Sequence, residues 1–132
     1  MQLGNNGLES FGAHTITTGA EQATGLYAAD VDSDGDMDIL SSSREGNNLE
    51  WYENNGSQNF TSRNAGVPEY AQSVYAIDID DDGDIDLLSA SSTDDRIDWY
   101  EATGSSGALI FNTGAKSIDT DADGAKKVFA ID

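Results

Sequence analysis

Aspartates at alternate positions recur in two short stretches of the chain. The sequence "DVDSDGDMD" spans residues 30–38, and "DIDDDGDID" spans residues 78–86. When such a loop curls, alternate side chains turn inward, and the central glycine permits the sharp turn. Calcium takes six to eight oxygen ligands, so the sequence predicts one calcium site in each loop. The predicted ligands are Asp30, Asp32, Asp34, Asp36 and Asp38 in the first loop and Asp78, Asp80, Asp82, Asp84 and Asp86 in the second.

The position of each aspartate sets its expected role. An EF-hand-like loop supplies side chains at positions 1, 3 and 5 and a backbone carbonyl at position 7. The glutamate of position 12 is missing, because Ser41 and Ser89 stand there, so Asp38 and Asp86 at position 9 are expected to close the sites. The alternative is an ordinary solvated turn, which aspartate and glycine also favour. The repulsion among clustered carboxylates with no nearby lysine or arginine favours a cation, and the flexible oxygen-only loop favours calcium over magnesium.

Composition limits the classes of partner. The 132 residues suffice for about one domain, and the net charge is −19, with 25 acidic and 6 basic residues. This charge argues against nucleic acid and anionic membrane surfaces as partners. No apolar run is long enough to cross a bilayer, and no cysteine is present to form a disulfide. The opening "MQLGNNGLES" has neither the basic start nor the apolar stretch of a secretion signal.

An internal repeat organises the chain. Residues 26–53 align with residues 74–101 at a shift of 48 without a gap, and 14 of 28 positions are identical, including "YA", the aspartate loop, "LS" and "WYE". A third copy begins at "VFAID", and "NNG" before Phe11 matches "NNG" before Phe60, with Phe111 next in this series. The predicted units are a partial blade with a last strand and loop at 1–25, a repeat at 26–73, a repeat at 74–127, and the first strand of a third repeat at 128–132.

Hydrophobic residues within a unit alternate with a period of two, which is typical of half-buried strands. Strand-like runs occupy Val74–Ile79, Ile85–Ser91, Ile97–Glu101 and Ala108–Thr113. A repeat of this length with short strands fits one blade of four antiparallel strands in a β-propeller. We therefore predict an all-β fold of propeller-type blades, about two and a half in this chain. A β-sandwich is the alternative, although a sandwich does not require sequence repeats.

The pattern "VYAIDIDDDGDIDLLSASS…IDWYE" closely resembles the VCBS and FG-GAP repeats, whose relatives include the propeller of integrin α-subunits. The resemblance implies propeller blades with calcium in the loop between the first two strands, and it assigns the ligands to the ten aspartates named above. It also implies an extracellular or cell-surface protein that serves in adhesion, in carbohydrate recognition or as an accessory part of a secreted enzyme. Known propellers have four or more blades, so both ends of this array look open. We expect either a longer propeller or self-association through the open blade ends.

Other residues have weaker signals. Trp51, Tyr52, Trp99 and Tyr100 could form a sugar-stacking surface, but repeated aromatics in strands more often pack between blades. His14, the only histidine, has no cysteine or serine motif nearby and is not expected to be catalytic.

Two further motifs occur in predicted loops. "DTDADGA" at residues 119–125 looks like half of a calcium loop, but it lacks the later aspartates, so a turn is predicted. Asn55 and Asn59 match the glycosylation acceptor pattern, which matters only in a glycosylating secretory pathway.

Three functions follow from these observations. The first, which we favour, is a non-catalytic, calcium-binding extracellular module that binds glycans or surface proteins. The second is a structural repeat subunit that assembles into an oligomeric ring or a filament. The third and weakest is an accessory part of a polysaccharide-active enzyme, because the clustered carboxylates are already assigned to metal and no nucleophile–base motif is visible.

Overall fold

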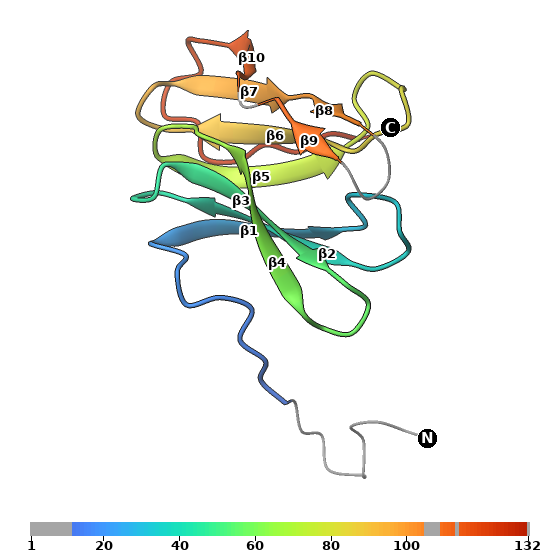
Figure 1. Ribbon diagram of the computed structural model, residues 1–132. Helices are drawn as coiled ribbons and strands as arrows, with labels where there is room; N and C mark the ends of the chain where they lie inside the picture. Colours follow the sequence, from blue (N-terminus) through green and yellow to red (C-terminus); the bar gives the residue numbers. More distant parts are fainter. Residues whose placement is uncertain (1–11, 105–108, 113, 132) are drawn as a thin grey trace.

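The computed structural model describes residues 12–104, 109–112 and 114–131. The matching positions predicted before residue 12, including Phe11, lie outside the described residues. Ten β-strands and no helix are present in the described ranges, which therefore contain no helix long and apolar enough to cross a membrane. The predicted all-β class is confirmed (Figure 1).

The first sheet is an antiparallel meander in the order β1-β2-β3-β4. Its register places Tyr27 opposite Leu40, Leu40 opposite Trp51 and Trp51 opposite Arg63. Because side chains alternate across a strand, these residues share one face of the sheet. The strands are β1 (Ala23–Ala29), β2 (Asp38–Ser43), β3 (Asn48–Asn54) and β4 (Phe60–Gly66).

The second sheet repeats this arrangement, with the strand order β10-β7-β6-β5. Strands β5, β6 and β7 overlap the predicted runs. The register of the sheet places Tyr75 opposite Leu88 and Leu88 opposite Trp99. The shift of 48 residues therefore holds for three pairs of equivalent strands, namely β1 and β5, β2 and β6, and β3 and β7. The strands are β5 (Ala71–Ile77), β6 (Asp86–Ser91), β7 (Arg96–Tyr100) and β10 (Lys116–Asp119).

The fourth strand of the second sheet differs from the prediction of Ala108–Thr113. Within that range, β9 (Ile110–Phe111) forms a short hairpin with β8 (Ala102–Thr103). The strand that pairs with β7 is β10, in which Lys116 lies opposite Trp99 as Arg63 lies opposite Trp51. Between the tryptophan and the basic residue opposite it, the second repeat is thus five residues longer than the first. In place of the single strand β4, the second repeat has two short strands, β9 and β10.

The ends of the described chain contain no strand. Residues 12–22, within the partial blade predicted at 1–25, have only turn or irregular structure, and the last three residues of that unit already belong to β1. Residues 120–131 have only turn or irregular structure as well. The predicted first strand of a third repeat at 128–132 is therefore not a strand over its described part. Instead, the backbone N–H of Val128 donates to Ser73 Oγ across 3.0 Å, which holds this segment beside β5. A strand requires a partner with a matching ladder of hydrogen bonds, and a single bond to a side chain does not supply one.

The two sheets pack against each other through complementary faces. We call the face with Leu40, Leu49 and Trp51 the tryptophan face of the first sheet, and the face with Val74, Ala76, Leu87 and Tyr100 the tyrosine face of the second. All seven side chains are buried in one hydrophobic cluster. The indole of Trp51 also meets the ring of Phe111 edge-on, with centroids 5.9 Å apart. This interface forms the core of the molecule.

The first strands of the two sheets approach each other closely. A Cβ atom on Gly25 would lie 2.9 Å from Ser73 Cα, so only glycine fits there without displacement. Next to it, Thr24 Oγ1 donates to the carbonyl of Ala71 across 2.6 Å. The equivalent residues Tyr27 and Tyr75 contact each other, with ring centroids 4.6 Å apart. Strand β1 of the first sheet and strand β5 of the second accordingly lie next to each other where the two sheets meet (Figure 1).

Candidate metal centres

Each aspartate loop connects the first two strands of its sheet. The first loop lies between β1 and β2, and the second lies between β5 and β6. Both loops curl in the same way, because the carboxylate at position 1 accepts two backbone N–H groups. Asp30 accepts from Asp34 and Gly35, each across 3.0 Å, and Asp78 accepts from Asp82 and Gly83 across 3.1 and 2.9 Å.

Backbone conformation explains the glycine in each loop. Gly35 and Gly83 have φ angles of +96° and +98°, which side chains of L-residues rarely permit. Ser33 and Asp81, two residues earlier, each have a φ of +60°. The curled backbone is therefore specified by the loop sequence itself, which turns the side chains at positions 1 and 3 toward a common centre.

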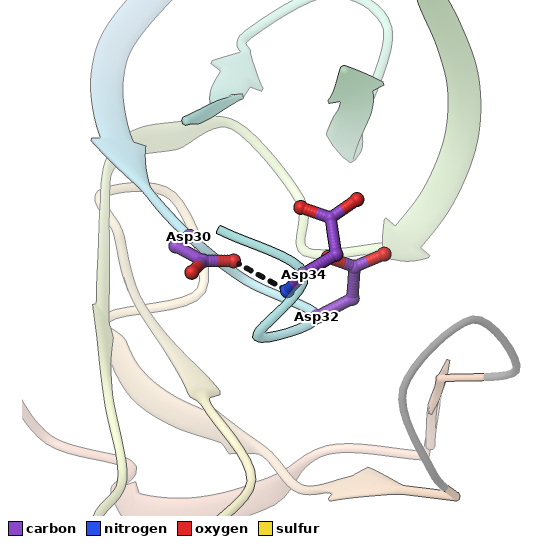
Figure 2. Close-up of side chains that lie close together, drawn as sticks. All are labelled: Asp30, Asp32 and Asp34. Atoms are coloured by element: carbon purple, nitrogen blue, oxygen red, sulfur yellow. Dashed lines mark hydrogen bonds between the residues drawn. The ribbon is translucent and has the colours of Figure 1, made fainter. Parts of the chain in front are cut away.

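Three carboxylates meet in each loop. In the first loop, oxygen atoms of Asp30, Asp32 and Asp34 lie within 4.8 Å of one another, and Figure 2 shows their side chains around the curled backbone. The second loop brings together Asp78, Asp80 and Asp86 at the same spacing. Oxygen atoms at such distances can share one cation, so six of the ten predicted ligands lie where a metal could contact them.

Asp32 best fits a bound cation. Its side chain is only 4% exposed, and its buried Oδ1 has no hydrogen-bond partner among the described residues. Burial raises the pKa of this carboxyl group, and the negative charges of Asp34 and Asp38 raise the pKa further. A buried carboxylate without a partner is costly. A divalent cation at the centre of the cluster would supply the missing partner and offset the repulsion.

The aspartates at position 9 also bind the backbone. Asp38 is buried, and it accepts hydrogen bonds from Val31 N across 3.2 Å, from Trp51 Nε1 across 2.9 Å and from Asn54 N across 2.7 Å. Asp86 is buried as well, and it accepts from the backbone N–H groups of Ile79 and Ala102. Burial raises the pKa of Asp38 and of Asp86, and these hydrogen bonds partly oppose the increase. Both residues therefore fasten the loop to the strands that follow.

The remaining predicted ligands lie outside the two clusters. Asp36 lies close to Gly56 in the β3–β4 loop. A Cβ atom placed on Gly56 would be only 2.5 Å from Oδ2 of Asp36. Asp82 Oδ1 accepts the backbone N–H of Asp84 across 2.9 Å, as Asp34 Oδ1 accepts that of Asp36. These contacts are Asx-turns, the alternative considered for the loops. Turn formation does not exclude cation binding, since Asp34 accepts the N–H of Asp36 with one oxygen and its other oxygen remains available.

The clustered carboxylates have no basic partner within the described residues. The four ion pairs found there connect Arg63 to Glu53, Arg96 to Asp94 and Asp98, and Lys116 to Glu101. None includes an aspartate of either loop. The negative charge of the loops is thus not neutralised by side chains of the described chain.

The structure also reveals supporting residues that the sequence did not indicate. Arg63 lies over the Trp51 ring and pairs with Glu53. Lys116 lies 4.3 Å from the centroid of the Trp99 ring, and its ammonium group is 2.6 Å from Glu101. The repeated "WYE" thus places a basic residue of the fourth strand between an indole and a glutamate. A search for a basic residue after each "WYE" could have indicated this, but the longer second repeat moves Lys116 out of alignment.

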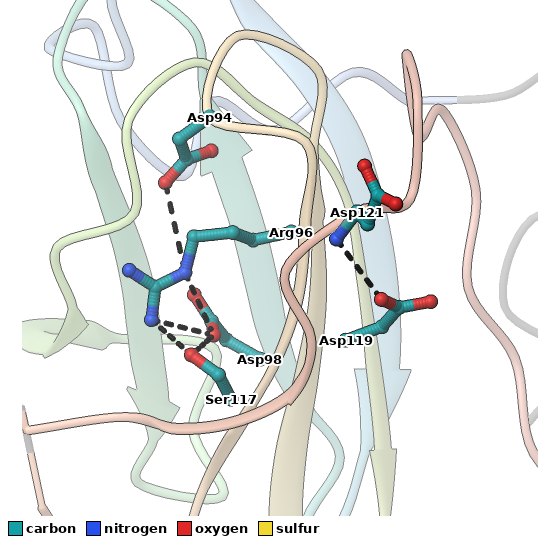
Figure 3. Close-up of polar contacts among 6 residues, drawn as sticks. All are labelled: Asp94, Arg96, Asp98, Ser117, Asp119 and Asp121. Atoms are coloured by element: carbon teal, nitrogen blue, oxygen red, sulfur yellow. Dashed lines mark hydrogen bonds and ion pairs between the residues drawn. The ribbon is translucent and has the colours of Figure 1, made fainter.

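The "DTDADGA" segment forms a turn beside the β6–β7 hairpin. Asp119 Oδ1 accepts the N–H of Asp121 across 3.0 Å, and Asp95 Oδ1 accepts that of Gly124 across 2.8 Å. Figure 3 shows the contact between Asp119 and Asp121 together with Arg96, which binds Asp98 and Ser117. No group of three carboxylates in the described chain includes an aspartate of this segment. The turn interpretation is therefore supported.

The aromatic pairs are largely packed within the protein. Trp51, Tyr52 and Tyr100 are buried, and Trp99 is half-buried beneath Lys116. Packing, rather than a sugar-stacking surface, thus accounts for them. His14 is exposed and lines an apolar cavity beside the first sheet.

Comparison with known families agrees with this architecture. The family model for an FG-GAP-like repeat matches residues 30–89, from the first aspartate loop to just beyond the second. The resemblance predicted from the loop sequences is confirmed over this span, and the open, four-stranded antiparallel sheets agree with propeller-type blades. The chain has no significant match among the curated proteins or among the solved structures with which it was compared.

Proposed function

We propose that this FG-GAP-like repeat protein is a non-catalytic, calcium-binding module that acts outside the cell or at its surface. In this role, calcium fixes the two aspartate loops, and the blades present a surface to glycans or to surface proteins. The observation that carries the proposal is the Asp32 carboxylate, which is buried beside other carboxylates and has one oxygen without a hydrogen-bond partner in the described part of the chain.

The donor set supports calcium as the cation. Only oxygen atoms face the centre of each cluster, and the loops are short and curled rather than rigid cages. Calcium accepts such irregular sets of carboxylate, carbonyl and water oxygens more readily than magnesium does. A site at about 100 times its dissociation constant would add roughly 2.7 kcal/mol to stability. The proposed role of calcium is therefore to stabilise the blades.

A binding role rather than catalysis agrees with how the carboxylates are used. Those at position 1 of each loop accept backbone N–H groups, and those at position 9 connect the loops to neighbouring strands. Such carboxylates are held by the fold and are poorly placed to exchange protons with a substrate. The extracellular location is proposed from the FG-GAP-like match, because calcium is abundant outside cells.

Calorimetric titration with calcium tests the proposal directly. The native chain should bind two calcium ions and should bind magnesium more weakly. Asp32→Asn and Asp80→Asn should each remove one site, one in each loop. Asp123→Asn, an exposed aspartate outside both clusters, serves as the control and should keep both sites. Absence of calcium binding by the native chain, or two intact sites in Asp32→Asn, would refute the proposal.

A glycan array, probed with the labelled chain in calcium and in chelator, tests the binding role. Capture of one glycan class that is lost in chelator is the expected result. An array of cell-surface proteins, probed in the same two conditions, tests the other class of partner. If calcium binds but neither array captures the chain, the binding role is wrong and calcium serves stability alone.

A further inference from the structure

The two sheets show which face of a blade contacts its neighbour. Within the chain, the tryptophan face of the first sheet packs against the tyrosine face of the second. At the shift of 48 residues, the tyrosine face of the first sheet consists of Leu26, Ala28, Ile39 and Tyr52, which correspond to Val74, Ala76, Leu87 and Tyr100. One tyrosine face is thus covered by a blade, and the other has no blade against it within the described chain.

The free tyrosine face is apolar and open. Leu26 is 71% exposed, whereas its equivalent Val74 is only 5% exposed. A cavity of about 530 Å³ lies over this face, and it is lined by Leu26, Ala28, Ile39 and Tyr52 together with residues 14–17 and 20. The segment before β1 therefore covers only part of a surface that is fully buried in the other blade.

The segment 126–131 has the complementary pattern. Val128 and Ala130 are half-buried beside β5, whereas Phe129 is 69% and Ile131 is 84% exposed. In the repeat, Phe129 corresponds to Tyr27 and Tyr75. Tyr27 packs against the cluster that contains Val74, the equivalent of Leu26. The chain thus already contains the contact that an exposed Phe129 and an exposed Leu26 could make between two molecules.

We propose that residues 126–131 of one copy dock along the free side of β1 in a second copy, with Phe129 against Leu26. The docked segment would follow β1 less closely than β1 follows β5, because Lys127 stands at the position equivalent to Gly25, but the first strands would still continue in the same order from one copy to the next. Leu26 and Phe129 of one copy both border the groove along β1 and β5. The contact is nevertheless head-to-tail, because the surface that β1 offers differs from the surface that the segment offers. Such contacts propagate into open chains or close into rings.

Charge favours this occupant. The chain has a net charge of −19, which opposes self-association in general. Lys126 and Lys127 are two of its six basic residues, and both are exposed at the start of the docking segment. On the second copy, Leu26, Ser41 and Glu50 lie opposite one another on three neighbouring strands. The two lysines would lie near these residues, where the negative charge of Glu50 would attract them. The segment is therefore suited to approach a negatively charged partner of its own kind.

Sedimentation velocity over a range of concentrations tests the docking. The native chain in calcium should increase in average mass with concentration. Leu26→Asp and Phe129→Asp should each remain monomeric, because each lacks one of the two complementary surfaces. An equimolar mixture of the two variants should form a heterodimer and nothing larger, since each variant retains the surface that the other has lost.

Ile110→Asp provides the matched control, because Ile110 is an exposed apolar residue outside both surfaces, and it should associate like the native chain. Circular dichroism should show that all variants remain folded, as the substituted side chains are exposed. A native chain that is monomeric at every concentration, association that persists in Leu26→Asp, or a mixture that stays monomeric would overturn the proposal. The docking does not rest on the calcium proposal, and calcium titration of the same variants distinguishes failure of one from failure of the other.

Discussion

The indole N–H of Trp51 donates to Oδ2 of Asp38 across 2.9 Å and thereby connects the third strand of the first sheet to the end of its aspartate loop. The same carboxylate accepts the backbone N–H groups of Val31 and Asn54, on either side of that connection. The loop and β3 thus form one unit. In the second sheet, Asp86 accepts the equivalent backbone N–H groups of Ile79 and Ala102.

Replacing Trp51 by phenylalanine tests this unit. The variant keeps the ring but removes a buried hydrogen bond to a charged group, so the free energy of unfolding should fall by about 1.5–3 kcal/mol. Urea denaturation followed by circular dichroism measures the change. Trp99→Phe is the matched control, because the indole N–H of Trp99 lies toward Asp86 without making, within the described residues, a hydrogen bond as well formed as that of Trp51, and it should cost less. Equal losses in the two variants would show that the Asp38 bond contributes little.

Position 3 of the two loops should respond differently to neutralisation in the absence of calcium. Asp32 is buried, whereas Asp80 is exposed. Asp32→Asn removes a buried charge and should raise the free energy of unfolding in chelator by on the order of 1 kcal/mol. Asp80→Asn should change it by less than about 0.5 kcal/mol. Thermal denaturation in chelator checks both values, and destabilisation by Asp32→Asn would contradict the assigned burial cost.

The pH dependence of stability should reverse between the calcium-free and calcium-bound forms. Burial raises the pKa of Asp32, Asp38 and Asp86 above the ordinary value of 3.8. The folded protein therefore binds more protons than the unfolded chain between 3.8 and the raised pKa values. In chelator, the free energy of unfolding should increase as the pH falls through that window. In calcium it should decrease, because protons compete with the metal for the same carboxylates.

Urea denaturation midpoints from about pH 7.5 down to about pH 4, with and without calcium, measure this reversal. The Asp32→Asn variant should show a weaker increase in chelator than the native chain does. A calcium-free protein that loses stability on acidification would show that groups other than these buried aspartates dominate.

Close approach of the first strands should make Gly25 intolerant of a side chain. The Cβ atom in Gly25→Ala would lie 2.9 Å from the backbone of Ser73, so β1 and β5 must separate. Overpacking of this kind costs about 1–3 kcal/mol. At Gly19, the corresponding Cβ atom would meet only Thr17 Oγ1 at 3.7 Å, so Gly19→Ala is the control. Similar denaturation midpoints for the two variants would mean that the strands separate at little cost.

Local features could be predicted from the sequence because they depend on neighbouring residues. The curl of each aspartate loop follows from its glycine and from the hydrogen bonds of Asp30 and Asp78, all within five residues. Strands β5, β6 and β7 follow from alternation with a period of two. The fourth strand of the second sheet could not be located in this way, because β10 is set by pairing with β7 across an additional stretch of chain.

By itself, the sequence determined two equivalent loops with the same aspartates at the same positions, since repeated residues produce repeated local structure. Only the tertiary structure decided that they differ. Asp32 is buried and Asp80 is exposed, and Asp86 joins a carboxylate cluster whereas Asp38 does not. The physical reason is that burial and electrostatics depend on what packs against a loop, and the two blades have different neighbours.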